Sequence, residues 1–263
     1  MKKQFLWMLT VILTICGAMM NTSCSSDDDD NPEGPATDNV RLTKMVMVTL
    51  MANGDTLAVS SQDLIWEDGL LKRINFFMRS MLMGTSLVRE DTFVYEGTNC
   101  TEIIHGSGTH DYFTYADGRL RTAVSTMSDG TITRLNVNAY TVDGHVSEMT
   151  KETIDEGNTT KMRYSLTWED GDLVSYVKHP IEPAGDDSAP TTFTYYDVPS
   201  PFTGYPMAHY ILNVDEIAGR GTKHYLKSGK NPKLENGRLV AETMEQTNIY
   251  YVYSDGTGST TAP

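Results

Sequence analysis

The sequence repeats a short pattern in which an aromatic residue stands two positions before an Asp-Gly pair. The copies are Trp66 before Asp68-Gly69, Tyr115 before Asp117-Gly118, Trp168 before Asp170-Gly171 and Tyr253 before Asp255-Gly256. Asp-Gly between two alternating segments favours a tight hairpin turn whose central residues take positive φ, which glycine adopts without strain and aspartate tolerates. Each copy is therefore predicted to be the tip of a β-hairpin.

Looser copies of the pattern fill the gaps. They are Tyr95 with Gly97, Tyr140 with Asp143-Gly144, and Tyr195 in the segment FTYYD. The aromatic residues at 66, 95, 115, 140, 168 and 195 are 20 to 29 residues apart, which leaves room for two strands and two turns in each unit. The chain is thus predicted to run back and forth as a series of hairpins.

The segment before the third tip alternates as a strand with one apolar and one wet face should. Tyr164, Leu166 and Trp168 fall on one side, and Arg163, Ser165, Thr167 and Glu169 fall on the other. We predict an all-β fold, a long antiparallel β-hairpin meander. Because about a dozen strands in one open sheet would leave exposed edges, the sheet is expected to curl into a barrel-like or roll-like shape.

One segment departs from the strand pattern. Apolar residues recur at helical spacing at Met207, Tyr210, Ile211, Val214 and Ile217. This spacing predicts a single short helix over about 205–218, near the C-terminal third of the chain, with Gly219 and Gly221 suited to its end. The apolar stripe of this helix needs a partner, and we expect the sheet to supply it.

Residues 1–23 have the form of a signal peptide, with Lys2 and Lys3 followed by an apolar run and then by small and polar residues up to Cys24. The stretch NTSCSSDDDDNPEGP resembles the start of a bacterial lipoprotein, and this resemblance implies that Cys24 carries the lipid. Asn21 departs from that pattern, because such cleavage sites usually have Leu at this place. An ordinary secretory signal with an incidental cysteine is the alternative.

Residues 24–40 are predicted to be an acidic flexible tether, because adjacent aspartates repel one another and cannot be buried together. Within the tether, the following residues look like the export tag of Bacteroidetes surface lipoproteins: Ser26, Asp27, Asp28, Asp29 and Asp30. The tag implies a protein that is lipid-anchored in the outer membrane and faces the cell exterior; a mere spacer is the alternative. Residues 41–263 are then expected to form a single β-meander domain.

The charge of the chain bears on its partners. The formal net charge is −14, so a nucleic-acid partner is not expected, since such a surface repels phosphates at long range. We expect contact with the membrane through the lipid anchor only, and a monomeric protein.

Few residues suggest chemistry. His105 and His110 flank a Gly-Ser-Gly-Thr segment and precede Asp111, which fits either metal binding or a His/Asp pair, or equally hairpin-turn histidines in solvent. No third ligand stands at a metal-motif spacing, so no metal site is predicted. Cys100 lies in a strand-like segment, where a structural thiol is expected rather than a nucleophile. The sequence predicts no catalytic residue, no cofactor and no enzyme.

The aromatic residues of the repeat offer a different role. Equivalent positions near the predicted tips are occupied by Trp66, Tyr115, Trp168 and Tyr195. The fold would bring them to one end of the sheet as a row, where they either stack on sugar rings, close over an apolar ligand, or cap the core at each hairpin. The core-capping role is favoured.

The tandem hairpins, the segment YYDVPSPF before a short helix, and the acidic leader together resemble a Bacteroidetes lipoprotein family of unknown function described as having a porin-like fold. The resemblance implies a β-barrel-like meander and brings no catalytic residues with it. A membrane pore is not expected, because the strands carry charge on both faces, whereas a spanning barrel presents a continuous apolar band outward.

Two tripeptides in the sequence suggest sites of O-glycosylation. Asp55-Thr56-Leu57 and Asp187-Ser188-Ala189 look like the short sites at which exported Bacteroidetes proteins are O-glycosylated, so Thr56 and Ser188 are candidates. The expected function is non-catalytic binding of a glycan, a host polymer or an outer-membrane partner at the cell surface. A carrier of a small apolar ligand in a barrel cavity is the alternative, and a hydrolase is a distant third.

Overall fold

The computed structural model describes residues 40–80, 85–227, 230–244 and 246–258. The strands, in chain order, are β1 (Leu42–Leu50), β2 (Thr56–Glu67), β3 (Leu70–Ser80), β4 (Thr85–Glu96), β5 (Asn99–Ile104), β6 (His110–Ala116), β7 (Arg119–Thr126), β8 (Ile132–Tyr140), β9 (Val146–Asp155), β10 (Asn158–Glu169), β11 (Asp172–Glu182), β12 (Thr191–Thr192), β13 (Tyr195–Pro199), β14 (His224–Leu226), β15 (Lys230–Glu235), β16 (Arg238–Met244) and β17 (Thr247–Tyr253). Two short helical segments, η1 (Met207–His209) and α2 (Val214–Arg220), lie between β13 and β14.

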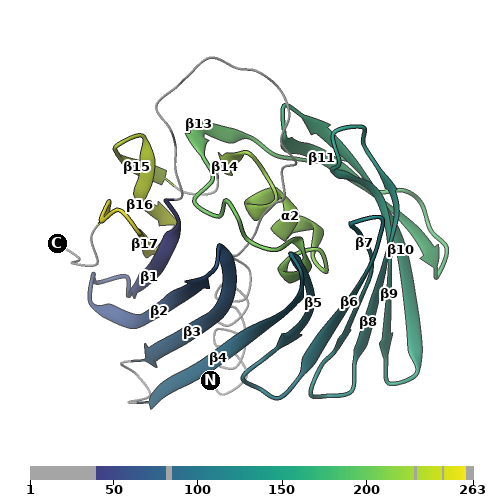
Figure 1. Cartoon of the computed structure of the whole chain (residues 1–263), viewed down its shortest axis with the longest axis horizontal. Helices are drawn as coiled ribbons and strands as arrows, with labels where there is room; N and C mark the ends of the chain where they lie inside the picture. Colours follow the sequence, from purple (N-terminus) through teal and green to yellow (C-terminus); the bar gives the residue numbers. More distant parts are fainter. Residues whose placement is uncertain (1–39, 81–84, 228–229, 245, 259–263) are drawn as a thin grey trace.

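Most of these strands belong to one antiparallel sheet. It has 15 strands in the order β12-β11-β10-β9-β8-β7-β6-β5-β4-β3-β2-β1-β17-β16-β15, and β13 and β14 form a second sheet of two strands. From β1 to β11 each strand pairs with the next one along the chain, and β17 returns to pair with β1. Because β12 and β15 remain as edges, the sheet is curled but not closed (Figure 1). The predicted all-β meander is therefore confirmed.

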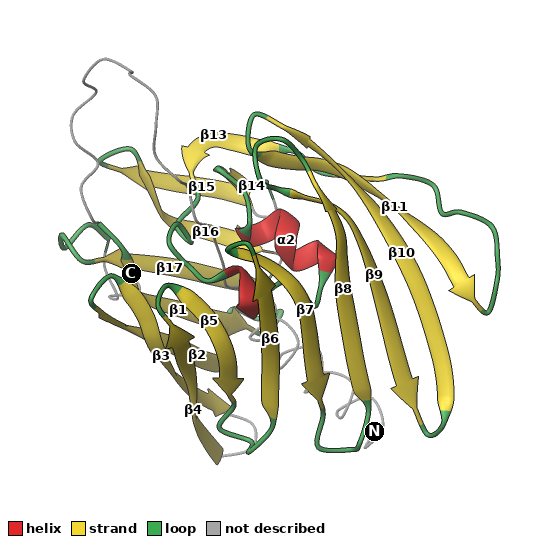
Figure 2. Cartoon of the chain, turned by 45° about the vertical axis from the view of Figure 1, so that its right-hand side comes forward, coloured by secondary structure: helices red, strands yellow, loops and turns green. Residues whose placement is uncertain are grey.

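The curled sheet surrounds the helical segments. Figures 1 and 2 both show α2 inside the curl, with β13 and β14 between the two ends of the sheet. On one side of this opening β13 contacts β16, and on the other Tyr195 of β13 donates a hydrogen bond to the carbonyl of Leu173 in β11. The small sheet thus bridges the gap that the large sheet leaves open.

Strand alternation places the core on the concave side. In β8, Thr133, Leu135 and Val137 are buried, whereas the alternate residues Arg134 and Asn136 are exposed. Apolar residues of the inner face join those of the enclosed segment, such as Phe202 and Ile211, in one core cluster. Burial of apolar surface between sheet and enclosed segment is what stabilises the curl.

The predicted hairpin tips have the expected backbone. Asp68 and Gly69 have φ of 49° and 81°, Asp117 and Gly118 have 54° and 72°, and Asp170 and Gly171 have 47° and 79°. Both central residues of each turn are therefore left-handed, as a two-residue turn matched to the strand twist requires. Beside each of these tips the register shifts by one residue next to the aromatic residue, between Ile65 and Trp66, Thr114 and Tyr115, and Thr167 and Trp168.

The fourth Asp-Gly copy differs from this prediction. Only Gly256 has positive φ, at 84°, because the Asp255 carboxylate accepts the backbone N–H of Thr257 at 2.9 Å. This local hydrogen bond favours an ordinary turn over the left-handed form. The turn follows β17, and no further strand follows it within the described residues.

The prediction of one continuous helix over about 205–218 is wrong, because the structure has two separate helical segments there. Asn213 is extended, with φ −131° and ψ 115°, and its side chain accepts the N–H of Asp215 at 3.2 Å. Asn213 thus caps a new helix that begins at Val214, which separates η1 from α2. The predicted apolar stripe is nonetheless placed against the sheet, since Tyr210, Ile211, Val214 and Ile217 are all buried in the core cluster.

Candidate functional site

Each aromatic residue of the repeat donates a hydrogen bond from its polar end to a backbone carbonyl of a preceding strand. The bonds are 2.5 to 2.9 Å long and run from Trp66 to Leu42, Tyr95 to Leu71, Tyr115 to Cys100, Tyr140 to Leu120, Trp168 to Val146, Tyr195 to Leu173 and Tyr253 to Leu239. The side chains of the accepting residues are buried in the core. We call this series the tip ladder. It ties successive hairpins together at one end of the sheet.

Neighbouring side chains cover the faces of several of these rings. Cations lie 4.6 to 5.7 Å from the ring centroids in the pairs Arg41–Trp66, Lys72–Tyr95, Arg119–Tyr140 and Arg238–Tyr253, and the His145 ring stacks on Trp168 at 4.4 Å. The proposed ligand-stacking residues Trp66, Tyr115, Trp168 and Tyr195 are all partly buried. These contacts support the core-capping role, and a ligand-stacking role for the four rings stays a prediction.

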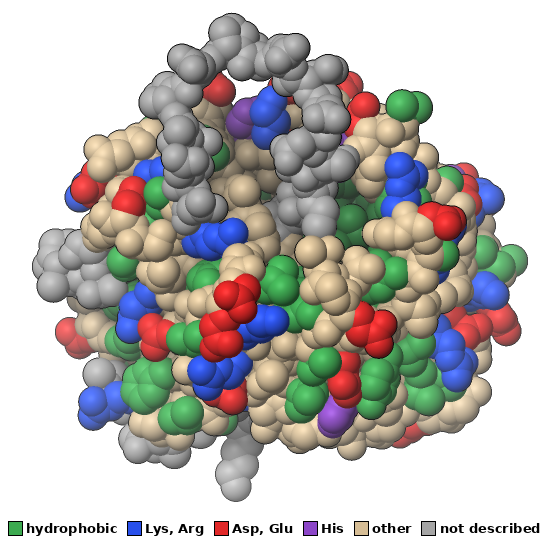
Figure 3. All heavy atoms as spheres, in the orientation of Figure 1, with side chains coloured by type: hydrophobic (Ala, Val, Ile, Leu, Met, Phe, Trp, Pro, Cys, Tyr) green, Lys and Arg blue, Asp and Glu red, His purple; other side chains and the backbone are tan. Residues whose placement is uncertain are grey.

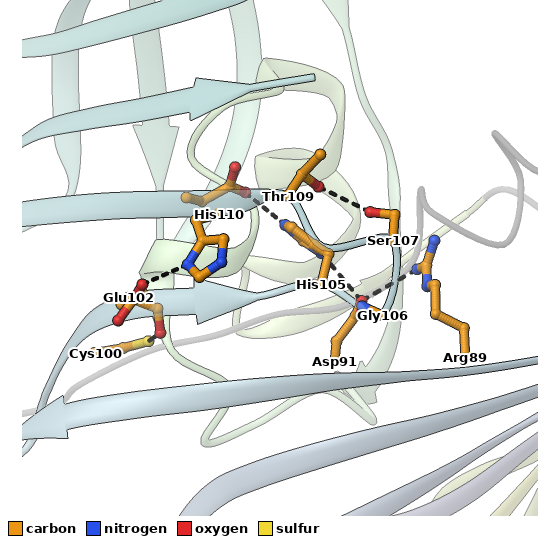
Figure 4. Close-up of polar contacts among 10 residues, drawn as sticks. Arg89, Asp91, Cys100, Glu102, His105, Gly106, Ser107, Thr109 and His110 are labelled. Carbon is orange, nitrogen blue, oxygen red and sulfur yellow. Dashed lines mark hydrogen bonds and ion pairs between the residues drawn. The ribbon is translucent and has the colours of Figure 1, made fainter. Parts of the chain in front are cut away.

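A second cluster forms where β4, β5 and β6 meet (Figure 4). The imidazole of His105 lies between two carboxylates, with Nδ1 3.3 Å from Asp91 Oδ2 and Nε2 3.0 Å from Asp111 Oδ2. Asp91 also accepts from Arg89 at 3.1 Å and from the backbone N–H of Gly106 at 3.1 Å. The His/Asp pair that the sequence left open is therefore present as His105–Asp111, and Asp91 joins it from a neighbouring hairpin.

Charge governs this cluster. Burial lowers the pKa of His105, but hydrogen bonds to Asp111 and Asp91 outweigh it and raise this pKa to about 9. Burial raises the pKa of Asp91, but the hydrogen bond with His105 and the charge of Arg89 outweigh it and hold this pKa below its ordinary value. At neutral pH the cluster is a partly buried ion network that attaches the 105–110 turn to β4. Within the described part of the chain, no group of three or more His, Cys, Asp or Glu side chains is placed to hold a metal ion.

Comparison with solved structures finds similarity to a porin-like protein from Bacteroides uniformis. The two chains share 13% sequence identity and superpose with a TM-score of 0.46, and the match covers 81% of this chain and 98% of that chain. No protein-family model matches the sequence. No curated protein matches it either.

The outer face of β4, β5 and β6 carries apolar and polar side chains next to one another. Val94 faces Glu102 across the sheet, and Glu102 faces Tyr112. The Tyr112 side chain is 52% exposed, and the His110 ring stacks on it with centroids 5.9 Å apart. His110 Nδ1 also lies 2.6 Å from Glu102 Oε1. We call Val94, Glu102, His110 and Tyr112 the outer-face patch.

Sequence reasoning missed the outer-face patch. The alternation in HDYFTYA marks Tyr112 as a residue between the inward Asp111 and Phe113, and this signal identifies an outward-facing aromatic residue. In the view of Figure 3, hydrophobic side chains lie among acidic and basic ones rather than in separate fields.

The interior holds a buried cation. Arg220 of α2 is 1% exposed and lies 5.4 Å from the Phe202 ring centroid, and neither of its Nη atoms has a hydrogen-bond partner among the described residues. Burial lowers its pKa to about 9. Nearby, Tyr225 and Tyr251 both donate to Oε1 of the buried Glu242. Burial raises the pKa of Glu242 above its ordinary value, although these two hydrogen bonds act in the opposite direction.

Cys100 is a buried free thiol in β5, where its Sγ lies 3.5 Å from the carbonyl of Glu102. Burial raises the pKa of this thiol to about 12. A thiol that stays protonated at neutral pH is a poor nucleophile, which agrees with the structural role predicted for Cys100.

The remaining predicted residues are of two kinds. The signal peptide, Cys24, and the tag residues Ser26, Asp27, Asp28, Asp29 and Asp30 lie outside the described residues. Thr56 is partly buried at the start of β2, and the Ser188 hydroxyl accepts the backbone N–H of Lys178 at 3.0 Å.

Among the helices that the structure describes, none has the length and apolar character to cross a membrane.

Proposed function

We propose that the protein is a lipoprotein anchored in the outer membrane by Cys24, that it faces the cell exterior, and that it binds a glycan there. The leader sequence supports the anchor, and the acidic tag supports the orientation. The observation that carries the binding role is the exposed Tyr112 ring beside the His110–Glu102 pair.

The chemistry of the outer-face patch suits a sugar. An aromatic ring presents an apolar face on which the C–H face of a pyranose stacks, and a neighbouring carboxylate and imidazole bond its hydroxyl groups. Glu102 lies directly opposite Tyr112 in the register, so the two side chains start about 5 Å apart at Cβ. A sheet face also keeps such groups at fixed spacing, which lowers the entropic cost of binding.

Binding on the outer face is favoured over carriage of an apolar ligand inside the curl. Side chains of the enclosed segment, including Phe202, Tyr205 and Ile211, are buried against the concave side of the sheet. A carrier would need that space for its ligand. We therefore do not propose the carrier function.

The test is binding of the full-chain lipoprotein, in detergent micelles, to a panel of soluble polysaccharides. We expect Tyr112→Ala to weaken binding of a retained glycan by about 5- to 12-fold, because one stacked ring contributes about 1 to 1.5 kcal/mol. Val142→Ala is the matched control, since Val142 is 98% exposed and lies in the β8–β9 turn. Equal binding by the wild type and Tyr112→Ala, or binding of no polysaccharide at all, would contradict the proposal.

A further inference from the structure

Three polar side chains near one edge of the sheet form a hydrogen-bonded chain. Ser165 Oγ lies 2.9 Å from Nε2 of His179, and Nδ1 of the same ring lies 2.8 Å from Oδ1 of Asp187. A carboxylate can only accept, so the neutral ring carries its hydrogen on Nδ1, and Nε2 accepts the hydrogen of the Ser165 hydroxyl. The order of contacts is hydroxyl, imidazole, carboxylate.

The register of the β10–β11 hairpin creates the first contact. Val174 is an extra residue in β11, so that Trp168 faces Leu173 but Thr167 faces Ser175. Beyond this shift, Ser165 faces Val177 and Arg163 faces His179. Ser165 and His179 are therefore diagonal neighbours on the outer face, within reach of a long side chain. Without the extra residue, His179 would point to the opposite face.

The chain after β11 supplies the carboxylate. The backbone N–H of Ser188 donates to the carbonyl of Lys178 at 2.9 Å, and the Ser188 hydroxyl accepts the N–H of Lys178 at 3.0 Å. These two bonds hold the 183–190 loop alongside β11, at the end of the sheet where β10 and β11 lie side by side (Figure 2). Asp187 is thus placed next to His179, whose side chain is 18% exposed while that of Asp187 is 62% exposed.

We propose that Ser165, His179 and Asp187 are a nucleophilic triad that cleaves carboxylic esters. A hydroxyl bonded to an imidazole that a third group orients is the arrangement by which unrelated folds activate serine, and it is recognised by geometry rather than by position in the sequence. The three residues have no motif spacing, because the fold brings them together only through the strand register and the returning loop.

The reaction follows from these contacts. Ser165 Oγ bonds to the ester carbonyl carbon while its proton passes to His179 Nε2, and Asp187 stabilises the resulting imidazolium. The carbon–oxygen bond to the alcohol then breaks, and the alcohol leaves with the proton from Nε2. Water adds to the Ser165 ester by the same route, which releases the carboxylic acid and restores the hydroxyl. Arg163, on the same face and opposite His179, offers a cation for the oxyanion.

Ester cleavage goes beyond glycan binding, and it opposes the sequence-based expectation of a non-catalytic protein. The alternative is that the three side chains are only a polar surface network, in which the serine has ordinary reactivity. The two cases differ in whether Ser165 reacts faster because of His179.

The experiment treats the full-chain lipoprotein, in detergent micelles, with a fluorophosphonate probe and maps the modified peptide by mass spectrometry. We expect labelling at Ser165, its loss in Ser165→Ala, a decrease in labelling rate of at least about 100-fold in His179→Gln, and a smaller decrease in Asp187→Asn, because the Asp187 side chain is 62% exposed. Ser175→Ala is the matched control, because Ser175 lies on the same face of β11 and is expected to leave labelling unchanged. Circular dichroism melts confirm that each variant is folded.

Turnover of p-nitrophenyl acetate provides the second readout. We expect release of p-nitrophenol by the wild type and Ser175→Ala, and none above the buffer rate by Ser165→Ala. Absence of label at Ser165 would overturn the inference. Label at Ser165 that forms equally fast in folded His179→Gln would overturn it as well, since the hydroxyl would then react without the imidazole.

Discussion

Trp168 donates its indole N–H to the backbone carbonyl of Val146 over 2.8 Å, and its ring stacks on His145, the residue before Val146. One side chain of the β10–β11 hairpin therefore holds both the backbone and a side chain of the hairpin before it. The same arrangement is found at two other tips. The Tyr140 ring contacts Arg119 and its hydroxyl donates to the carbonyl of Leu120. The Trp66 ring contacts Arg41 and its N–H donates to the carbonyl of Leu42. The repeated sequence pattern is thus a connector between hairpins.

Substitutions of Trp168 measure the strength of one connection. Trp168→Phe keeps a ring against His145 but removes the N–H donor, so we expect a loss of about 1 kcal/mol in the free energy of unfolding. Trp168→Ala removes the ring as well, and we expect a loss of about 3 kcal/mol. Urea unfolding of both variants checks these values, with the exposed Thr167→Ala as control. A stability of Trp168→Ala equal to that of the wild type would show that the tip ladder does not hold the fold.

A substitution at Gly118 tests whether a hairpin tip needs a residue with positive φ. No atom of the described residues lies within 4 Å of the place where a Cβ at Gly118 would be, so Gly118→Val tests the positive φ of 72°. A β-branched residue in this region costs about 1 to 3 kcal/mol, and thermal melting should show the loss. Asp117→Asn, at the neighbouring position with φ 54°, is expected to be neutral because Asn tolerates this conformation. A neutral Gly118→Val would refute the turn type.

The His105 cluster makes stability depend on pH on the alkaline side. The pKa of His105 is about 9 in the folded protein and about 6.5 for an exposed imidazole, so its contribution is complete below about pH 6.5 and lost as pH rises through 9. We expect the wild type to lose up to about 3 kcal/mol relative to His105→Gln over this interval. Urea unfolding at pH 6, 7.5 and 9.5 measures the difference. Parallel curves for the two proteins would exclude a charged His105.

The buried Arg220 is expected to destabilise the folded protein. Within the described part of the chain its Nη atoms have no hydrogen-bond partner, and burial lowers its pKa. Arg220→Met should therefore leave stability unchanged or raise it by about 1 to 4 kcal/mol, as replacement of buried charges by apolar residues often does. Met has a similar length and fits irregular space in a core. A melting temperature well below that of the wild type would instead show that the guanidinium is stabilised in the folded protein. Arg134→Met, at an exposed position of β8, is the control.

The leader sequence predicts where the protein lies in the cell. Cys24→Ala should move the protein from the membrane fraction to the soluble fraction, because the lipid has no other attachment point in the proposal. Replacing Asp27, Asp28, Asp29 and Asp30 with alanine should protect the protein from protease added to intact cells. Protection of the wild type under the same conditions, with a known surface protein cleaved, would refute the outward orientation.

Local chemistry explains which features were predictable from the sequence. The tip at Asp68-Gly69 was predicted because positive φ at both positions depends only on those two residues. The break at Asn213 was not predicted, because a capping side chain interrupts a helix whose apolar spacing continues through it. Strand register determines two further contacts, that of Asp91 with His105 and that of Ser165 with His179. A single extra residue such as Val174 sets that register, and hydrophobic alternation does not reveal it.

The open seam between the edge strands β12 and β15 leaves the circumference of the curl free to vary. Because each aromatic connector of the large sheet donates a hydrogen bond to the strand before it, insertion or deletion of a complete hairpin changes these bonds only between neighbouring hairpins. A closed barrel has no such freedom, since its strand number, tilt and stagger are fixed together. Duplication of hairpins is therefore a route by which chains of this design can change length, while β13 and β14 adjust to span whatever gap remains.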